Sequence, residues 1–428
     1  MIHRPLSHLK VPALLAAASV ANAGGASLQV IAPGYFITDL SRDGTIAVGN
    51  TAGDFETFRW TAQSGFQRLG RATVPVIGRG AGTPDVSYDG TRVSASILSS
   101  DTKVTQGLWM GNAGWIEAMP PVPSDGANID ESWGSAWALS GDGTTVFGFY
   151  WGGTPVRAKA SSWKGSGVPL ALGQIVGRSA RVNGADFDGS VAVGWEERAD
   201  GVWRPTCWRE GNKITLEDSL AFAGAEAANV DGSVIVGNTY NPAIATVVAT
   251  VWRWNGSAYI TDMIGTLPDT PQVFGSAYLS SVSDDGLTAV GASRFSNQFS
   301  DATWAMIWTQ SGGLVRGEEY LTSLGLTLPP DTALISFNSI SADARAITGI
   351  IVQTVLPFES QSIIIRTAPP CVGDLSGDLV VNTQDLTMFL GAFGSTQPFG
   401  SNGDLNSDGA VNTLDLTIFL AQFGANCK

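Results

Sequence analysis

Two short acidic segments near the C-terminus place oxygen-bearing side chains at matching intervals. One runs from Asp374 to Asp385 and the other from Asp404 to Asp415. In both, positions 1, 3, 5, 9 and 12 carry Asp, Ser or Asn, and the backbone carbonyl of position 7 would add another oxygen. Oxygens at these places on a twelve-residue loop converge on a hard cation such as Ca²⁺. We predict two Ca²⁺ sites, whose ligands would be Asp374, Ser376, Asp378, Val380, Asn382 and Asp385, and Asp404, Asn406, Asp408, Ala410, Asn412 and Asp415.

The two loops differ at the point where the chain must turn most sharply. The second loop has Gly409 at position 6, as the tight turn of a calcium loop requires. The first loop has Leu379 there. We therefore expect the first site to bind Ca²⁺ more weakly than the second.

Apolar residues recur at helical spacing directly behind each loop. Offsets of 0, 3, 4 and 7 place such residues in one stripe along an α-helix. We expect two helices whose stripes pack against each other. The stripes would consist of Leu386, Phe389, Leu390 and Phe393, and of Leu416, Phe419, Leu420 and Phe423.

Neither loop can be preceded by a helix. Pro369-Pro370 lies before the first loop and Gly400-Ser401-Asn402-Gly403 lies before the second. A loop followed by a helix, without an entering helix, resembles the paired F-hand of type I dockerins, and the likeness spans residues 373–424. The resemblance implies a small all-α module that binds two Ca²⁺ ions and attaches its protein to a partner.

The resemblance also suggests where a partner would bind. Dockerins contact cohesins through loop positions 10 and 11 and through the helix surface, and these positions are Thr383, Gln384, Thr413 and Leu414. The helices lack the Lys and Arg that are usual in cellulosomal dockerins. We therefore expect either a cohesin-like partner or some other surface-anchoring protein.

Two of the three cysteines flank this module. A disulfide between Cys371 and Cys427 would clasp its two ends, and closing a loop of this length adds about 4 kcal/mol in the chain-entropy model. Many dockerins use an apolar or stacking clasp here, so the cysteine pair is a variant feature. Cys207 lies beside Trp208 in an apolar segment, and we expect it to be a buried small hydrophobe.

The N-terminus has the features of a secretory signal over residues 1–23. Arg4 and Lys10 supply positive charge, Val11 to Val20 form a short apolar run, and Ala21-Asn22-Ala23 is a small-x-small cleavage site. The apolar run is too short to span a bilayer. We expect a protein without a transmembrane anchor that is secreted, and extracellular or associated with a cell surface.

Removal of this segment would also remove the only histidines, His3 and His8. A chain without imidazole excludes Ser-His-Asp and Cys-His catalysis and His-ligated metal sites. The formal charge of −14 comes without a basic patch, which argues against nucleic acid and anionic membranes as partners.

A short phrase recurs roughly every fifty residues between residues 24 and 366. One copy reads Ser41-Arg42-Asp43-Gly44 and continues into a β-branched run that closes at Gly49. Asp-Gly favours a tight turn, the run favours a strand, and the closing Gly marks a strand end or a close backbone approach. The phrase contains Asp43, Asp89, Asp142, Asp188, Asp231, Asp285 and Asp343, and most copies are followed by a second strand around Trp60, Trp109, Trp163, Trp208, Trp252 or Trp308.

This period fits a four-stranded blade, and seven copies fit a seven-repeat β-propeller, with an open β-solenoid as the alternative. The phrase resembles an extracellular repeat family whose units read Ser-x-Asp-Gly-x-x-x-x-Gly and continue into an Arg-Trp strand, over about residues 36–350. It is not a sialidase Asp-box, because Gly follows Asp directly and no Trp closes the turn. Since the Asp and Trp residues recur once per unit, we interpret them as turn formers and as core between units.

We therefore expect a mainly β protein in four parts. Residues 1–23 would be a signal peptide, 24–366 a β-propeller-like repeat domain, 367–370 a linker and 371–428 the dockerin-like calcium module. Our first hypothesis for the function is a secreted, non-catalytic protein that binds or displays a polysaccharide or protein ligand. The alternative is a dockerin-bearing glycoside hydrolase or lyase that uses a carboxylate pair. Its candidate acids outside the repeat phrase are Glu117, Glu131, Glu196 and Glu318.

Overall fold

The computed structural model describes residues 19–21, 25–71, 82–120, 132–268, 276–294, 303–356, 358–367, 373–376, 380–396, 403–406 and 410–425. β-Strands dominate these residues, and three α-helices accompany them. The chain is thus mainly β, as the sequence predicts. No helix within the described ranges is long and apolar enough to cross a membrane.

Most strands follow one another as antiparallel meanders of four. The first four meanders each form a sheet of their own. They are β3 (Tyr35–Leu40), β4 (Ile46–Thr51), β5 (Thr57–Thr61) and β6 (Gly65–Arg68); β7 (Asp85–Val86), β8 (Val93–Leu98), β9 (Val104–Trp109) and β10 (Trp115–Glu117), with a 3₁₀ turn at Gly111–Ala113; β11 (Gly134–Leu139), β12 (Val146–Gly152), β13 (Arg157–Trp163) and β14 (Leu170–Ala171); and β15 (Ala180–Ala185), β16 (Val191–Glu197), β17 (Trp203–Arg209) and β18 (Asn212–Thr215).

The remaining strands form two larger sheets. Two meanders are joined by a single parallel pair between Val247 and Ser276. They consist of β19 (Gly224–Ala228), β20 (Val234–Asn241), β21 (Thr246–Trp254) and β22 (Tyr259–Gly265), and of β23 (Ser276–Val282), β24 (Thr288–Arg294), β25 (Thr303–Thr309) and β26 (Gly313–Arg316). Helix α1 (Gly317–Ser323) follows. The last sheet has the order β1 (Ser19–Ala21), β2 (Ser27–Val30), β29 (Ser360–Arg366), β28 (Ala346–Gln353) and β27 (Thr332–Ile340).

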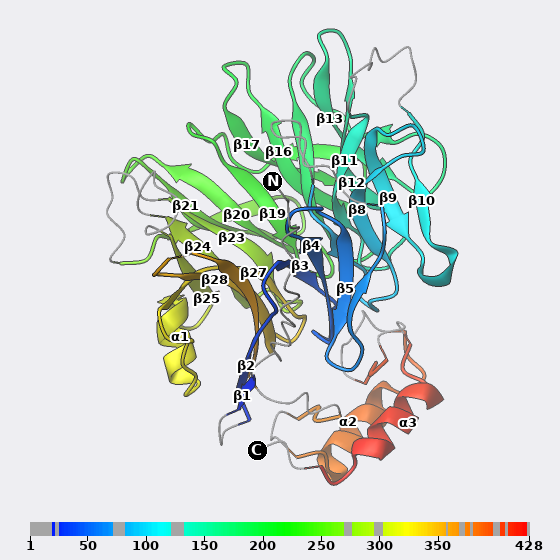
Figure 1. Ribbon diagram of the computed structural model, residues 1–428, viewed down its shortest axis with the longest axis vertical. Coiled ribbons are helices and arrows are strands. Elements are labelled where there is room, and N and C mark those ends of the chain that lie inside the picture. The colour runs from blue at the N-terminus through cyan, green and yellow to red at the C-terminus, as the bar shows by residue number, and fades with distance from the viewer. Residues whose placement is uncertain are drawn as a thin grey trace, which may run out of the picture.

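The sheets form a closed ring (Figure 1). The first strand of each meander contacts the first strand of the next, in the order β3, β7, β11, β15, β19, β23 and β27, and β27 contacts β3 again. The ring is also closed by hydrogen bonding, because β2 pairs with β29 and places Leu28 opposite Ile365. Four-stranded meanders arranged radially in a closed ring are a β-propeller.

The Ser-x-Asp-Gly phrase forms the turn between the first two strands of a meander. In the first copy, Ser41 Oγ donates to Asp43 Oδ1 at 2.7 Å, and that oxygen also accepts from Thr45 N at 2.9 Å. Gly44 has a φ of +67°, which a side chain would strain. The Ser–Asp hydrogen bond recurs between Ser87 and Asp89, Ser140 and Asp142, Ser283 and Asp285, and Ser341 and Asp343. The repeated Asp residues therefore form turns, as predicted.

The closing Gly of the phrase lies where two strands approach closely. The pairing between the first and second strands skips one residue of the first strand. The closing Gly pairs with the residue next to this skipped position, as Gly194 does with Val182. A Cβ on Gly194 would lie 1.9 Å from the carbonyl oxygen of Arg181. Gly49, Gly148, Gly237 and Gly291 meet a carbonyl oxygen in the same way. Of the two interpretations of this Gly, the close approach is confirmed.

An Arg on the third strand connects each of several meanders to the next. Arg209 Nη1 donates to the carbonyl of Gly232, the turn Gly of the following meander, at 3.1 Å. Arg59 and Arg253 make the equivalent bonds to Gly90 and Gly286. At the ring closure, Arg366 Nη2 donates to the carbonyl of Gly44 at 2.7 Å.

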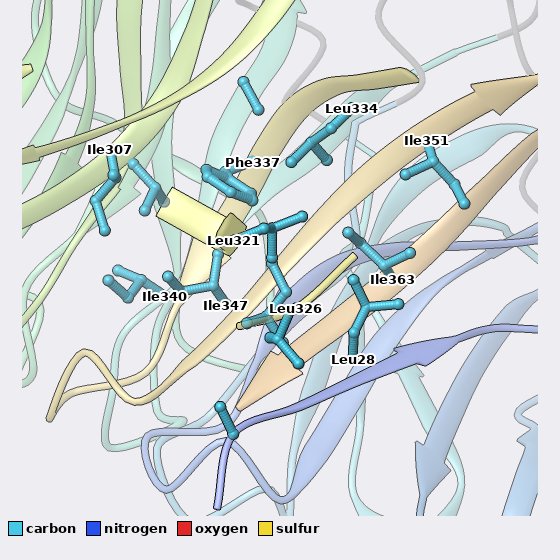
Figure 2. Close-up of a cluster of buried hydrophobic side chains, with 14 residues drawn as sticks. Leu28, Ile307, Leu321, Leu326, Leu334, Phe337, Ile340, Ile347, Ile351 and Ile363 are labelled. Carbon is cyan, nitrogen blue, oxygen red and sulfur yellow. The ribbon is translucent and has the colours of Figure 1, made fainter. Parts of the chain in front are cut away.

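Apolar side chains fill the space between sheets. Figure 2 shows the cluster around the last sheet, in which Leu28 of β2, Phe337 of β27 and Ile363 of β29 meet Leu321 of α1. The repeated Trp side chains contribute to such clusters as predicted. Trp60, Trp163, Trp208, Trp252 and Trp308 are buried, whereas Trp109 is only partly buried.

Two helices, α2 (Thr383–Ala392) and α3 (Thr413–Gln422), lie outside the ring of sheets (Figure 1). Phe389 and Phe419 stack at a centroid distance of 5.4 Å. Val381 and Val411, from the loop ends, complete this small core. The predicted stripe is wrong at Leu390 and Leu420, which are both 56% exposed, and at the helix ends, where Phe393 is 42% and Phe423 45% exposed. The helices meet along the line through Phe389 and Phe419, so residues one position further along face away.

Candidate functional site

The second predicted calcium loop wraps around the carboxylate of Asp415. Its Oδ1 accepts from Leu405 N at 2.8 Å and from Asn406 N at 3.0 Å, and its Oδ2 accepts from Asn412 N at 2.9 Å. Asn412 caps helix α3 by accepting from Leu414 N at 2.8 Å. The cap and the carboxylate thus bring loop positions 3, 9 and 12 together.

The first loop repeats this arrangement around Asp385. Its Oδ1 accepts from Ser376 N at 2.7 Å and its Oδ2 from Asn382 N at 2.8 Å. Burial raises the pKa of Asp385, but these backbone N–H donors outweigh burial and hold the pKa below its ordinary value. Asn382 Nδ2 donates to the carbonyl of Val380, so position 7 also lies beside the cap.

Several of the residues predicted for this module lie outside the described ranges. They are the ligands Asp378 and Asp408, the position-6 residues Leu379 and Gly409, and the cysteines Cys371 and Cys427. No group of three or more Asp, Glu, His or Cys side chains that could hold a metal ion occurs within the described part of the chain. In each loop, two of the three aspartates lie within the described ranges. These are Asp374 and Asp385 in the first loop, and Asp404 and Asp415 in the second.

The negative charge of the segment between Cys371 and Cys427 favours the binding of a cation. Between Cys371 and Cys427 the sequence has aspartates at six positions and no Lys, Arg or His. Asp385 and Asp415 are fully buried and Asp404 is 3% exposed. Buried carboxylates need a counter-charge or a bound metal ion, and the segment supplies no cationic side chain of its own. The all-oxygen donor set is the kind that Ca²⁺ prefers.

The four residues assigned to partner contact lie at the first turns of the helices. Thr383, Gln384, Thr413 and Leu414 are all exposed. Further exposed apolar side chains continue along both helices, namely Met388, Leu390 and Phe393 on α2 and Leu420 and Phe423 at the end of α3. An apolar surface of this kind on a small module is typical of an interaction site.

The ring of inner strands encloses a second candidate site. A cavity of about 430 Å³ is lined by residues of all seven first strands or the turns that follow them. On its wall, the carboxylates of Asp39 and Asp85 lie side by side, and both accept from Val86 N, at 3.1 and 2.8 Å. Burial and the neighbouring Asp39 carboxylate raise the pKa of Asp85 well above its ordinary value.

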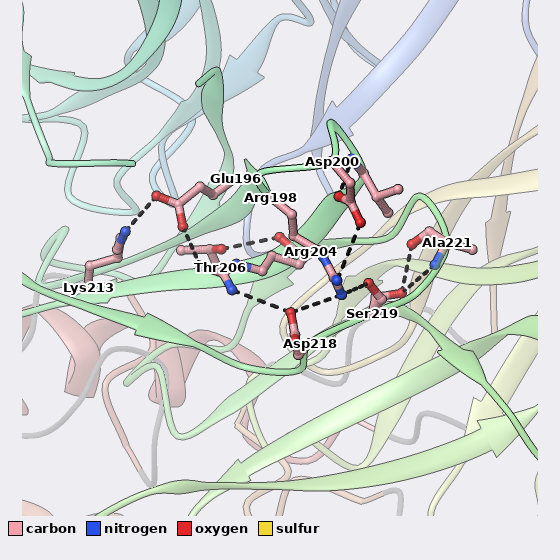
Figure 3. Close-up of polar contacts among 10 residues, drawn as sticks. Glu196, Arg198, Asp200, Arg204, Thr206, Lys213, Asp218, Ser219 and Ala221 are labelled. Atoms are coloured by element: carbon pink, nitrogen blue, oxygen red, sulfur yellow. Dashed lines mark hydrogen bonds and ion pairs between the residues drawn. The ribbon is translucent and has the colours of Figure 1, made fainter. Parts of the chain in front are cut away.

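The Glu residues considered for catalysis are not brought together. Glu196 is fully buried and pairs with Lys213 at 2.6 Å and Arg204 at 3.0 Å (Figure 3). Glu117 pairs with Arg71 in another sheet, and Glu318 pairs with Arg316 beside α1. Glu131 lies outside the described residues. Each of the three described candidates is paired with its own Arg or Lys, and they lie apart on β16, β10 and α1.

The Asp39–Asp85 pair was missed by sequence reasoning. A signal was present, since each Asp lies two residues before the Ser of its phrase and the later copies have no acid there. Val86 N donates to both carboxylates, so the two acids lie side by side on the cavity wall.

No known protein family and no curated protein sequence matches the chain. Among solved structures, TolB from Acinetobacter baumannii aligns with a TM-score of 0.40 and 14% identity, over 64% of this chain and 63% of TolB. The β-propeller domain of Cps50 (Swd1) from Myceliophteria thermophila aligns at 0.46 and 11%, over 78% of this chain and 98% of that domain. The β-propeller domain of the trilobed protease from Pyrococcus furiosus aligns at 0.45 and 10%, over 76% and 94%. The β-propeller assignment itself rests on the strand order and ring closure.

Proposed function

We propose that this chain is a secreted, non-catalytic binding protein, in which a seven-bladed propeller is attached to a partner through a calcium-dependent, dockerin-like module. The observation that carries the proposal is the set of buried aspartates in a segment without cationic side chains. Two Ca²⁺ ions would neutralise them, held by the ligands predicted for the two loops. A disulfide between Cys371 and Cys427 would hold the ends of the module together.

Isothermal titration of the full chain with Ca²⁺ tests the module. We expect two sites, and we expect Asp415→Asn and Asp385→Asn each to weaken one of them. Both substitutions keep the size of the side chain and remove one negative charge. Asp262→Asn in β22 is the matched control, because Asp262 is exposed and lies outside both loops. A chain that takes up no Ca²⁺, or one in which the control weakens binding equally, contradicts the proposal.

The exposed apolar side chains of α2 and α3 support attachment to a cohesin-like or other surface-anchoring protein. Leu414 is 60% exposed and lies at one of the positions that dockerins use. We expect Leu414→Asp to abolish capture of the full chain on surface proteins of the producing cell, while Ca²⁺ uptake stays unchanged. Capture that persists in this variant, or that is unaffected by EDTA, contradicts attachment through this surface.

Export is tested by sequencing the N-terminus of the protein recovered from the medium. We expect a chain that begins near Gly24, which would retain strand β2 and lose β1. A mature protein that still contains His3 and His8 contradicts the predicted signal.

A further inference from the structure

The cavity at the centre of the propeller has the size of a small-molecule site. Its volume of about 430 Å³ falls within the roughly 300–1,000 Å³ of typical ligand pockets. At the end formed by the Asp-Gly turns, Arg42 and Asp284 form an ion pair, and Arg42 lies over the ring of Tyr88.

The acidic groups of the cavity are largely balanced in charge. Asp284 is paired with Arg42, and burial raises the pKa of Glu226 to about 7 although the nearby Arg181 favours its charged form. Burial and the neighbouring Asp39 carboxylate raise the pKa of Asp85 well above its ordinary value, which favours the neutral form of Asp85. A site with so little net charge favours a neutral ligand over a cation.

The rest of the wall offers many hydrogen-bonding groups and the aromatic rings of Trp137, Tyr278 and Phe337. Asn183 Nδ2 donates to Glu226 Oε2 at 3.0 Å, and Arg181 Nε donates to Asn183 Oδ1 at 2.7 Å, so Glu226 is held in place. Trp137 is fixed by Arg181, whose Cζ lies 3.5 Å from the ring centre. Further hydroxyl and amide groups on the wall belong to Thr38, Thr83, Ser280, Ser281, Ser339, Asn338 and Tyr278.

We propose that this cavity binds a neutral saccharide of one or two rings, or the end of a glycan chain of that size. Hydroxyl groups of the sugar would donate to Glu226 and to the Asp39–Asp85 pair, and amide and hydroxyl side chains would meet the remaining sugar hydroxyls. The rings of Trp137 and Tyr278 provide apolar surface for the C–H face of the sugar. The proposal rests on the non-catalytic binding function above and names the ligand class of the propeller.

The test is isothermal titration of the full chain with glucose, galactose, mannose, N-acetylglucosamine and the β1,4-linked disaccharides of glucose and N-acetylglucosamine. At about pH 8, above the pKa of about 7 of Glu226, we expect Glu226→Gln to weaken binding about tenfold, because a hydrogen bond to a charged acceptor becomes one to a neutral amide. Glu359→Gln is the matched control, since Glu359 is exposed and does not line the cavity. Ala227→Phe fills the cavity and is expected to abolish binding, with the melting temperature of each variant checking that it is folded.

Three results would overturn the proposal. They are the absence of binding by every saccharide of the panel, equal affinity in Glu226→Gln and the parent chain, and tighter binding of a cationic amine such as putrescine. These results are independent of the calcium titration, so failure of the saccharide site leaves the calcium module unaffected. Release of cleaved sugar during the titration would instead contradict the non-catalytic function.

Discussion

Asp85 and Asp39 show how one shared backbone donor ties neighbouring repeats together. Asp85 Oδ2 also accepts from Leu139 N at 2.8 Å, and Asp39 Oδ1 accepts from Ser339 Oγ at 2.7 Å. The pair therefore links four first strands, β27, β3, β7 and β11. The cost is repulsion between the two carboxylates when both are charged.

Asp39→Asn is expected to remove this repulsion, because the amide carries no charge. We expect the variant to be more stable than the parent chain by about 1 kcal/mol at pH values near 8, and equally stable at mildly acidic pH. Urea unfolding at the two pH values measures the difference. A variant that is less stable than the parent at both would show that the carboxylate of Asp39 is needed in its charged form.

Other buried acids give the propeller a pH dependence of the same sign. Burial raises the pKa of Asp186 and of Asp284 to about 6 and that of Glu226 to about 7. An acid with a higher pKa in the folded state binds more protons when folded. Its stabilising contribution is complete below the unfolded pKa, near 4, and is lost as pH rises through about 6 to 7.

We therefore expect the melting temperature of the propeller to fall by several degrees between about pH 5 and pH 8. The acids with lowered pKa, such as Asp54 and Asp89, titrate below this window and do not oppose the trend. Calorimetry at constant Ca²⁺ measures the shift. A melting temperature that rises over the same range would contradict the burial of these acids.

Among the strands, the closing Gly of the phrase is needed because another backbone lies against it. We expect Gly194→Ala to destabilise the propeller by about 2–3 kcal/mol, because the new methyl group would overlap the carbonyl of Arg181. Gly312→Ala, in the turn after β25, is the matched control, since its Cβ would meet only the movable Thr309 side chain. Equal urea midpoints for the two variants would contradict this explanation of the repeat.

The arginines of the third strands act between elements in a similar way. At the ring closure, the guanidinium of Arg366 donates a hydrogen bond to the carbonyl of Gly44, the turn Gly of the first meander. We expect Arg366→Ala to cost about 2 kcal/mol, because a charged hydrogen bond to a carbonyl is lost. Urea unfolding measures the cost, and a change no larger than that of Arg345→Ala, a more exposed neighbour, would contradict the role of Arg366 in closure.

At the scale of the whole molecule, the sequence predicts the propeller because each repeat contains the residues that favour its own turn and its own strands. The Asp-Gly turn and the β-branched strand that follows it can be recognised from adjacent residues. They recur often enough to give the length of the repeat. The Asp39–Asp85 pair could not be predicted in this way, because the two acids meet only after the ring has assembled. The exposure of Leu390 escaped prediction for a related reason. Helical spacing defines a face, but the neighbouring helix decides which edge of that face is buried.

Closure by β2 is likewise a property of the whole ring. Strand β1 pairs only with β2 at the edge of its sheet, whereas β2 pairs with β29 and buries Leu28. We expect a chain that begins at Gly25 to melt at the same temperature as the longer protein, and a chain that begins at Ile31 to melt several degrees lower. Equal melting of the two shortened chains would contradict closure through β2.

The central claim is that Ca²⁺ orders the C-terminal module and leaves the propeller unaffected. Differential scanning calorimetry of the full chain, with Ca²⁺ and then with excess EDTA, tests it most directly. We expect two transitions, a large one from the propeller that stays in place and a small one that moves to lower temperature or disappears in EDTA. Asp415→Asn should move the small transition in the same direction. A thermogram that is unchanged by EDTA would contradict the claim.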